Sequence, residues 1–302
     1  MTIESQDQIQ KGKRRVINSI LCPTNLNPTS DEALRYGVAF ARAYNAKLYL
    51  CYVAENSKLM PLEEVNKFFV DSIAPYISET DSPWINWEGI ISNGEPEQVI
   101  IETAKEKKVD LIVMRSRRRP YAAMLLGSTT EAICHTAPCP VLITHPEERE
   151  WVDISTQEIG LKKVLVAYDF SSHADLALDY GLSLAQEFQA ELHLMNILPD
   201  KTDKSESEPT DYSNELAYLR NLIPSEVELW SKLIPVIVTG RPYQQILSYA
   251  QENNIDLIAM GARGKEAHNI WSLFGSNVDR VLRQASCPVL VAHLPENETQ
   301  ES

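Results

Sequence analysis

The chain has 302 residues, of which 44% are apolar, enough for two ordinary domains with buried cores and too apolar for disorder. Its net charge of −14 argues against a general surface for nucleic acid or anionic membranes, so a phosphate ligand needs a local site of its own. The N-terminal residues are polar with no apolar run behind them. We therefore expect no secretory signal, no membrane span and a cytoplasmic protein.

Patterns typical of strands and helices alternate along the chain, and the same series occurs twice. The matching blocks are 20–50 with 164–194, 94–114 with 240–260, and 137–145 with 285–293. Within them, YGVAFA corresponds to YGLSLA, VDLIVM to IDLIAM, and CPVLITH to CPVLVAH. Three blocks in the same order indicate an internal duplication.

The second copy has the clearer pattern. An apolar run, VLVAY, precedes a helical stretch in which Ala174, Leu178, Leu182 and Ala185 recur on one face. The strands ELHLMNIL, KLIPVIVT, IDLIAM and CPVLVAH follow, with helical patterns between most of them. Nearly continuous apolar strands alternating with helices predict, in each copy, an open, doubly wound α/β fold with a five-stranded parallel sheet.

The duplication predicts two domains related by a pseudo-two-fold axis. We expect them to span 14–146 and 160–295, with a charged linker between them and terminal tails outside them. The last strand of each copy is apolar enough to pair across a domain or subunit interface. A homo-oligomer, such as a dimer of the whole chain, and a regulatory protein partner are therefore both open.

Neither the cysteines nor the histidines predict a metal site. The five cysteines include no CxxC pair, which favours small buried residues in a reducing compartment. His145 and His293 end the last strands without ligand-like neighbours in the sequence, and we expect them on the surface. His268 lies in a glycine-containing loop, where approach to a phosphate is a minor alternative.

Two strands of the second copy end in residues suited to ligand binding. One is followed by Asp169, and another ends at Met260 and Gly261. Ligands of open α/β sheets bind beyond the carboxyl ends of strands, where the strand order reverses. If these two strands are neighbours, Asp169 and Gly261 lie on either side of one crevice. The alternative interpretation of Asp169 is a helix cap or turn residue.

The glycines after the second of these strands favour an anion site. Gly261 and Gly264 would let the backbone approach a ligand or adopt positive φ, and consecutive amides can hold phosphate oxygens. Gly275 and Ser276 then begin a predicted helix whose first amides would point at the same ligand. The alternatives are a plain strand-to-helix turn for the glycines and simple capping for Ser276.

This arrangement resembles the nucleotide-binding signature of the universal stress protein family, G-x2-G-x9-G-[ST], and the resemblance extends over both copies. It implies a tandem universal stress protein with the adenine-nucleotide α-hydrolase-like fold, binding ATP, often with Mg²⁺. By the same resemblance Ala167, Asp169, Ile197, Met260 and Gly261 would contact the adenosine, and Arg263, Gly264, Gly275, Ser276 and Asn277 the phosphates. In this sequence ten residues, including Trp271 and Phe274, separate Gly264 from Gly275, one more than in the signature.

The first copy departs further from the signature. Asn25 stands at the position of Asp169, and Arg115 and Arg118 stand at those of Gly261 and Gly264. We therefore predict that the first copy has lost the nucleotide site. For these arginines, together with Arg117 and Arg119, the alternatives are a solvent-facing or structural role, contact with the acidic loop at 200–215, and binding of another anion; the first is favoured because most charge runs are solvated.

The sequence leaves three functions open. The first is a regulatory module of the stress response that binds ATP in its second domain. The second is a slow ATPase or adenylating enzyme, although no acid, base or nucleophile can be named near the glycines, and hydrolase and Walker motifs are missing from the sequence. The third is a scaffold in which both sites have decayed.

Overall fold

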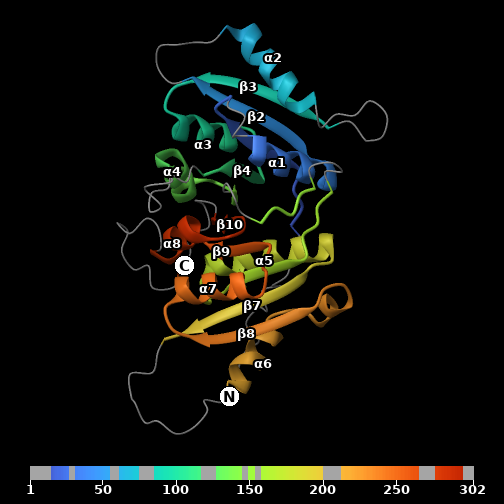
Figure 1. Cartoon of the computed structure of the whole chain (residues 1–302), viewed down its shortest axis with the longest axis vertical. Helices are drawn as coiled ribbons and strands as arrows, with labels where there is room; N and C mark the ends of the chain where they lie inside the picture. Colours follow the sequence, from blue (N-terminus) through green and yellow to red (C-terminus); the bar gives the residue numbers. More distant parts are fainter. Residues whose placement is uncertain are drawn as a thin grey trace, which may run out of the picture.

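The computed structural model describes residues 15–26, 31–54, 61–74, 85–116, 127–144, 149–153, 158–199, 212–264 and 276–294. These residues form an α/β molecule in which ten strands make one sheet, with the first half of the chain at one end and the second half at the other (Figure 1). The strand order is β3-β2-β1-β4-β5-β10-β9-β6-β7-β8. Each half thus has the order 3-2-1-4-5, so the expected doubly wound five-stranded arrangement is confirmed in each half, and the two halves are joined into one sheet.

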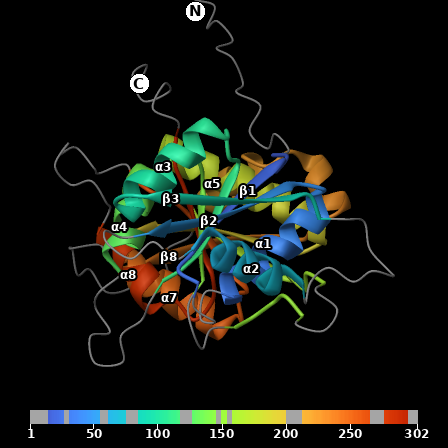
Figure 2. The ribbon, with the colours of Figure 1, turned by 90° about the horizontal axis from the view of Figure 1, so that it is seen from above.

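The first half alternates strands and helices as predicted. Its elements are β1 (Ser19–Thr24), α1 (Asp31–Tyr44), β2 (Lys47–Ala54), α2 (Leu62–Ile73), β3 (Trp87–Asn93), α3 (Pro96–Glu106), β4 (Leu111–Arg115), α4 (Ser128–Thr136) and β5 (Val141–Thr144). Apolar residues of α1 and α2 pack on one face of the sheet, and those of α3 and α4 pack on the other. Figure 2 shows α2 and α3 on opposite sides of β3.

The second half repeats this order. Its elements are β6 (Lys163–Ala167), α5 (Ser172–Phe188), β7 (Glu191–Leu198), α6 (Ser213–Asn221), the 3-10 helix η3 (Ser225–Leu229), β8 (Leu233–Thr239), α7 (Pro242–Glu252), β9 (Leu257–Gly261), α8 (Ser276–Gln284) and β10 (Val289–Ala292). Helices α5 and α6 share a face with α1 and α2, while α7 and α8 share the other with α3 and α4.

The two halves also share their unusual backbone turns. Leu26 and Phe170 both have positive φ, at 58° and 63°, in the turn after the first strand of each half. The same correspondence holds for Asn45 with Gln189, Lys108 with Asn254, and Gly94 with Gly240. Side chains at most of these positions differ, so the turn geometry is repeated even where the sequence is not.

The halves meet at an antiparallel pairing of β5 with β10, in which Leu142 is opposite Leu290. The last strands therefore pair within one chain. Aromatic side chains cover the junction: the rings of Phe40 and Phe188 lie 6.3 Å apart, and Trp151 packs edge-on against Tyr36 at 4.8 Å. Because these contacts join α1, α5 and the linker, burial stabilises the two halves as one unit.

Polar contacts reinforce the same junction. Ahead of β1, the Arg15 amide donates to Ser183 Oγ at 2.7 Å, and its guanidinium lies 2.8 Å from an Asp179 carboxylate oxygen. The linker is also packed, since Arg35 makes a two-pronged ion pair with Glu150. All five cysteines are buried and free, as predicted.

Candidate nucleotide site

The two strands that the sequence singled out are neighbours. Ala167, the last residue of β6, is paired in register with Met260 of β9. Helix α5 leaves β6 on one face of the sheet, and α8 follows β9 on the other. Since β7 lies on the far side of β6, the strand order reverses between β6 and β9. Asp169 and Gly261 therefore lie at a topological switch point, where ligands of such sheets bind.

The turn after β6 holds the Asp169 carboxylate in a fixed place. Asp169 Oδ1 accepts hydrogen bonds from the amide of Ser171 at 3.1 Å and from its hydroxyl at 2.6 Å. Ser171 is also the N-cap of α5, because its Oγ accepts the Ala174 amide at 3.2 Å. Local hydrogen bonds of this kind are typical of Asp-x-Ser sequences, so both interpretations of Asp169 remain compatible with its surroundings.

Two further side chains support this turn, and the sequence interpretation missed both. The Asn196 amide of β7 is buried and donates to the Tyr168 carbonyl at 2.8 Å. The Tyr168 hydroxyl, also buried, is hydrogen-bonded to Asp175 of α5. Asn196 stands between the apolar residues Met195 and Ile197, and this was the sequence signal that could have identified a buried polar contact.

The structure shows why a glycine is needed at position 261, a reason that the sequence did not reveal. A Cβ atom on Gly261 would lie 2.7 Å from both the carbonyl carbon and the Cβ of His173, and 2.8 Å from the Ala174 amide nitrogen. The glycines with positive φ in the described part of the chain are Gly94 and Gly240. Of the two reasons considered for Gly261, a close approach or positive φ, the structure does not show positive φ; close packing of α5 on β9 demands a residue without a side chain.

Gly264 faces Asp169 directly. A Cβ atom on Gly264 would lie 2.6 Å from Asp169 Oδ2, and Gly264 is itself exposed. It too lacks positive φ. The loop after β9 therefore passes against the carboxylate that Ser171 holds. Asp169, Ser171 and Gly264 form one contact group between the two loops.

The remaining predicted residues divide into two sets. Ile197 lies near the end of β7, paired with Val238 of β8, and Asn277 is half-buried in the first turn of α8. Ser276 begins α8, but its side chain lies outside the described residues. Gly275, with His268, Trp271 and Phe274, falls in the segment 265–275 that the structure does not describe.

The electrostatic surroundings of this edge are mixed. Burial lowers the pKa of His173, and the Arg263 guanidinium lowers it further, while Asp169 opposes the shift. Asp279, an acidic residue in the first turn of α8, is paired with Arg283 at 2.6 Å. The Arg283 guanidinium balances the Asp279 charge, which would otherwise disfavour an anion at this helix end.

His293 corrects a prediction. The sequence interpretation placed it on the surface, yet it is 6% exposed, because it follows the β10 strand at the covered junction. Burial lowers its pKa to about 3, helped by the nearby charges of His173, Arg263 and His135. The described residues include no group of three or more side chains able to hold a metal ion. His145 lies outside them.

The first half is different at the corresponding edge. Arg115 ends β4 where Gly261 ends β9, and its Nε atom lies 3.0 Å from Glu32 Oε2 on α1. Only 15% of the Arg115 side chain is exposed. Arg115 therefore does not face solvent, and its ion pair with Glu32 is a structural contact. Arg117, Arg118 and Arg119 lie outside the described residues.

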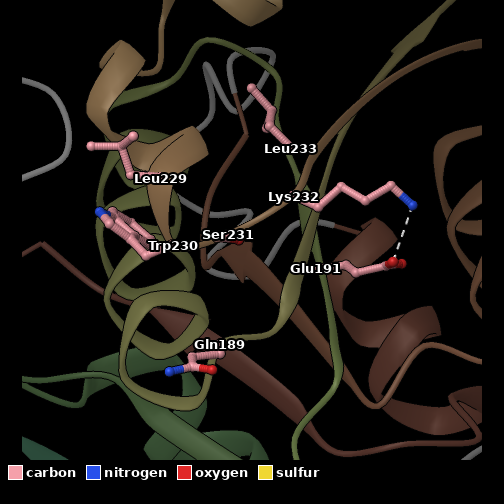
Figure 3. A pocket seen from close by; sticks show the side chains of 7 residues that line it. All are labelled: Gln189, Glu191, Leu229, Trp230, Ser231, Lys232 and Leu233. Carbon is pink, nitrogen blue, oxygen red and sulfur yellow. Dashed lines mark hydrogen bonds and ion pairs between the residues drawn. The ribbon is translucent and has the colours of Figure 1, made fainter.

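A separate hollow lies at the opposite edge of the sheet, where β7 and β8 begin (Figure 3). It has a volume of about 600 Å³ and is lined by Gln189, Glu191, Leu229, Trp230, Ser231, Lys232 and Leu233. The Lys232 ammonium is paired with Glu191 at 3.1 Å. This hollow lies beyond the amino ends of the strands, so its position does not match a switch-point ligand site.

Comparison with known proteins gives one consistent result. The model of the universal stress protein family matches residues 17–145 and again 160–293. A universal stress protein from Methanocaldococcus jannaschii, MJ0531, is 26% identical over 155 residues, covering 48% of this chain and 91% of the relative. Another from Synechocystis, Slr1230, is 28% identical over 60% of this chain and 57% of its own length.

A solved structure extends the likeness to nearly the whole chain. The crystal structure of a universal stress protein from Archaeoglobus fulgidus is similar with a TM-score of 0.67 and 27% identity. The match covers 91% of this chain and 98% of that one. In addition, no helix among the described residues is long and apolar enough to cross a membrane.

Proposed function

Because the chain belongs to the universal stress protein family, as a tandem member, we propose that it is a cytoplasmic regulatory protein of the stress response that binds ATP. The nucleotide is held in the second half, at the carboxyl edge of β6 and β9. One observation carries this proposal: Asp169 and Gly264 come together at the switch point of the second half. We propose the two units to be 14–146 and 160–295.

The residues of the proposed site fall into two groups, one for the adenosine and one for the phosphates. The adenosine is contacted by Ala167, Asp169, Ile197, Met260 and Gly261, and the phosphates by Arg263, Gly264, Gly275, Ser276 and Asn277. The exposed backbone at Gly264 supports the phosphate assignment, since uncovered amides bind anions without a large positive charge. Mg²⁺ would be bound together with the phosphates as part of the ligand and neutralise some of their charge.

One nucleotide per chain is expected. In the first half, the Arg115 guanidinium and its partner Glu32 occupy the edge at which Gly261 stands in the second. A guanidinium bound to a carboxylate fills space there and covers backbone. The two halves would then have unequal roles, with the first supporting the second through the β5–β10 junction.

The proposed module acts on other molecules through its shape or partners, and the β5–β10 pairing bears on this. In a chain with one such domain, the last strand would be free to pair with a second copy. Here β5 and β10 pair with each other within one chain. A homo-oligomer of the whole chain or a regulatory partner would need another surface.

Native mass spectrometry of the full chain, purified without added nucleotide and then incubated with Mg²⁺-ATP, tests the proposal. The expected mass corresponds to one ATP per chain, and Gly264→Val removes it. Gly127→Val is the matched control, because a Cβ at Gly127 meets nothing closer than 3.9 Å. Two nucleotides per chain, or none, would contradict the proposal, and the same spectra report the oligomeric state.

A further inference from the structure

Ser171, which the sequence patterns did not single out, contacts three parts of the proposed site. Its hydroxyl lies 2.6 Å from Asp169 Oδ1, 3.3 Å from the Arg263 carbonyl oxygen, and 3.2 Å from the Ala174 amide. These three groups belong to the turn after β6, the loop after β9 and the first turn of α5. One small side chain thus connects both loops at the switch point with the helix between them.

The single hydroxyl proton decides how these contacts are made. The 2.6 Å contact to the Asp169 carboxylate is the strong, charge-assisted bond, and the Arg263 carbonyl takes the weaker branch at 3.3 Å. The Ala174 amide donates to a lone pair of the same oxygen. Together with the Ser171 amide, which also donates to Oδ1 at 3.1 Å, the hydroxyl fixes one carboxylate oxygen from two directions.

We infer that Ser171 is a positioning residue for nucleotide binding, which holds the Asp169 carboxylate in its binding orientation and joins the β9 loop to it. The inference rests on the proposed function. With Oδ1 held by Ser171, Oδ2 is turned towards Gly264, where a Cβ would meet it at 2.6 Å. A preorganised carboxylate loses less freedom when the ligand arrives, so its fixation appears as affinity.

The same group of residues differs as a whole in the first half. The sequence has Asn25, Asn27 and Arg118 at the positions of Asp169, Ser171 and Gly264. Asn27 and Arg118 lie outside the described residues, so the comparison is one of sequence. If the three residues of the second half act together in one contact group, we expect all three to differ in a half that lacks the site, as they do.

Substitutions can separate this role from capping of α5. Glycine is nearly as good as serine at an N-cap, so Ser171→Gly keeps the helix start and removes the hydroxyl. Ser171→Thr keeps both. Ser172→Gly is the matched control, because Ser172 is the exposed neighbour on the first turn and introduces the same backbone freedom.

The experiment is calorimetric titration of the full chain with Mg²⁺-ATP and with adenosine. Ser171→Gly is expected to bind both about tenfold more weakly, since a hydrogen bond to a charged group is lost. Ser171→Thr should restore affinity to within about twofold, as expected for a side chain that keeps the hydroxyl. Wild-type affinity in Ser171→Gly, or equal loss in Ser172→Gly, would overturn the inference.

Hydrogen exchange without nucleotide distinguishes failure of this inference from failure of the proposed function. In Ser171→Gly, exchange should accelerate both in residues 169–174 and in residues 261–264, because the link between the loops is gone. In Ser172→Gly, only the first segment should change. Acceleration confined to 169–174 in both variants would overturn the inference. If the wild-type chain binds no nucleotide, the proposed function fails, and this exchange pattern still decides whether Ser171 joins the loops.

Discussion

At the carboxyl ends of their strands, the two halves share a turn with positive φ but carry different side chains. In both, a residue shortly after the first strand has positive φ: Leu26, two positions after β1, and Phe170, three positions after β6. In the second half, Asp169 faces a glycine across this edge, whereas in the first a partly buried Arg115 pairs with Glu32. The two halves thus share a scaffold, and they differ in the side chains at this edge; the proposal of one nucleotide per chain depends on that difference.

The largest effect is expected from Gly264→Val. A side chain there meets the Asp169 carboxylate at 2.6 Å and covers backbone that the phosphates would use, so ATP affinity should fall by about a hundredfold or more. Calorimetric titration measures the loss, and a denaturation curve close to that of the wild type shows that the fold is intact. Undiminished ATP binding would remove the site from the second half.

Gly261→Val should act mainly on stability. Its Cβ would lie within 2.8 Å of the α5 backbone, which cannot turn aside as a side chain can, so unfolding free energy should fall by about 1–3 kcal/mol. Urea denaturation compares it with Gly264→Val. If both variants have the same stability, the packing reason given for Gly261 is wrong.

Asp169→Ala and Asn25→Ala compare the two halves at one position. The first should weaken adenosine binding about tenfold or more, through loss of an oriented carboxylate, and the second should leave it unchanged. Titration with adenosine and with inorganic phosphate tells the two ends of the site apart, because phosphate binding should change little. Equal effects of the two substitutions would mean that the halves are not unequal.

Acid should weaken the folded state through His293. Its folded pKa, about 3, lies below the ordinary value near 6.5, so the unfolded chain binds the proton first. Stability is therefore complete above pH ~6.5 and is lost as the pH falls towards 3, by up to about 1.4 kcal/mol per unit. Urea midpoints between pH 7 and 5 should decline less steeply in His293→Gln, and an unchanged slope would contradict this.

The smallest effect is expected in the first half, from Arg115→Ala. Loss of its ion pair with Glu32, which is mostly shielded from solvent, should cost about 1 kcal/mol of stability and leave ATP stoichiometry at one per chain. Thermal denaturation and native mass spectrometry measure the two quantities. A second bound ATP in this variant would show that Arg115 alone closes the first half.

The sequence by itself determined the repeated architecture. Apolar strands such as VLVAY and amphipathic helices such as the one containing Leu178 and Leu182 are local patterns, and their periodicity predicts which face is buried. The duplication could be recognised because the same local patterns recur. The strand pattern also predicted that Asp169 and Gly261 lie at strand ends, and these strands are neighbours in the structure. Such features follow from short-range order along the chain.

Only the tertiary structure decided what those residues touch. That Gly261 is required by α5, that Gly264 lies against Asp169, and that His293 is buried all depend on contacts between segments far apart in the sequence. The pairing of β5 with β10 is of the same kind, since an apolar edge strand does not specify its partner. These distances depend on how the segments pack in three dimensions, and local sequence patterns give no distance between two loops.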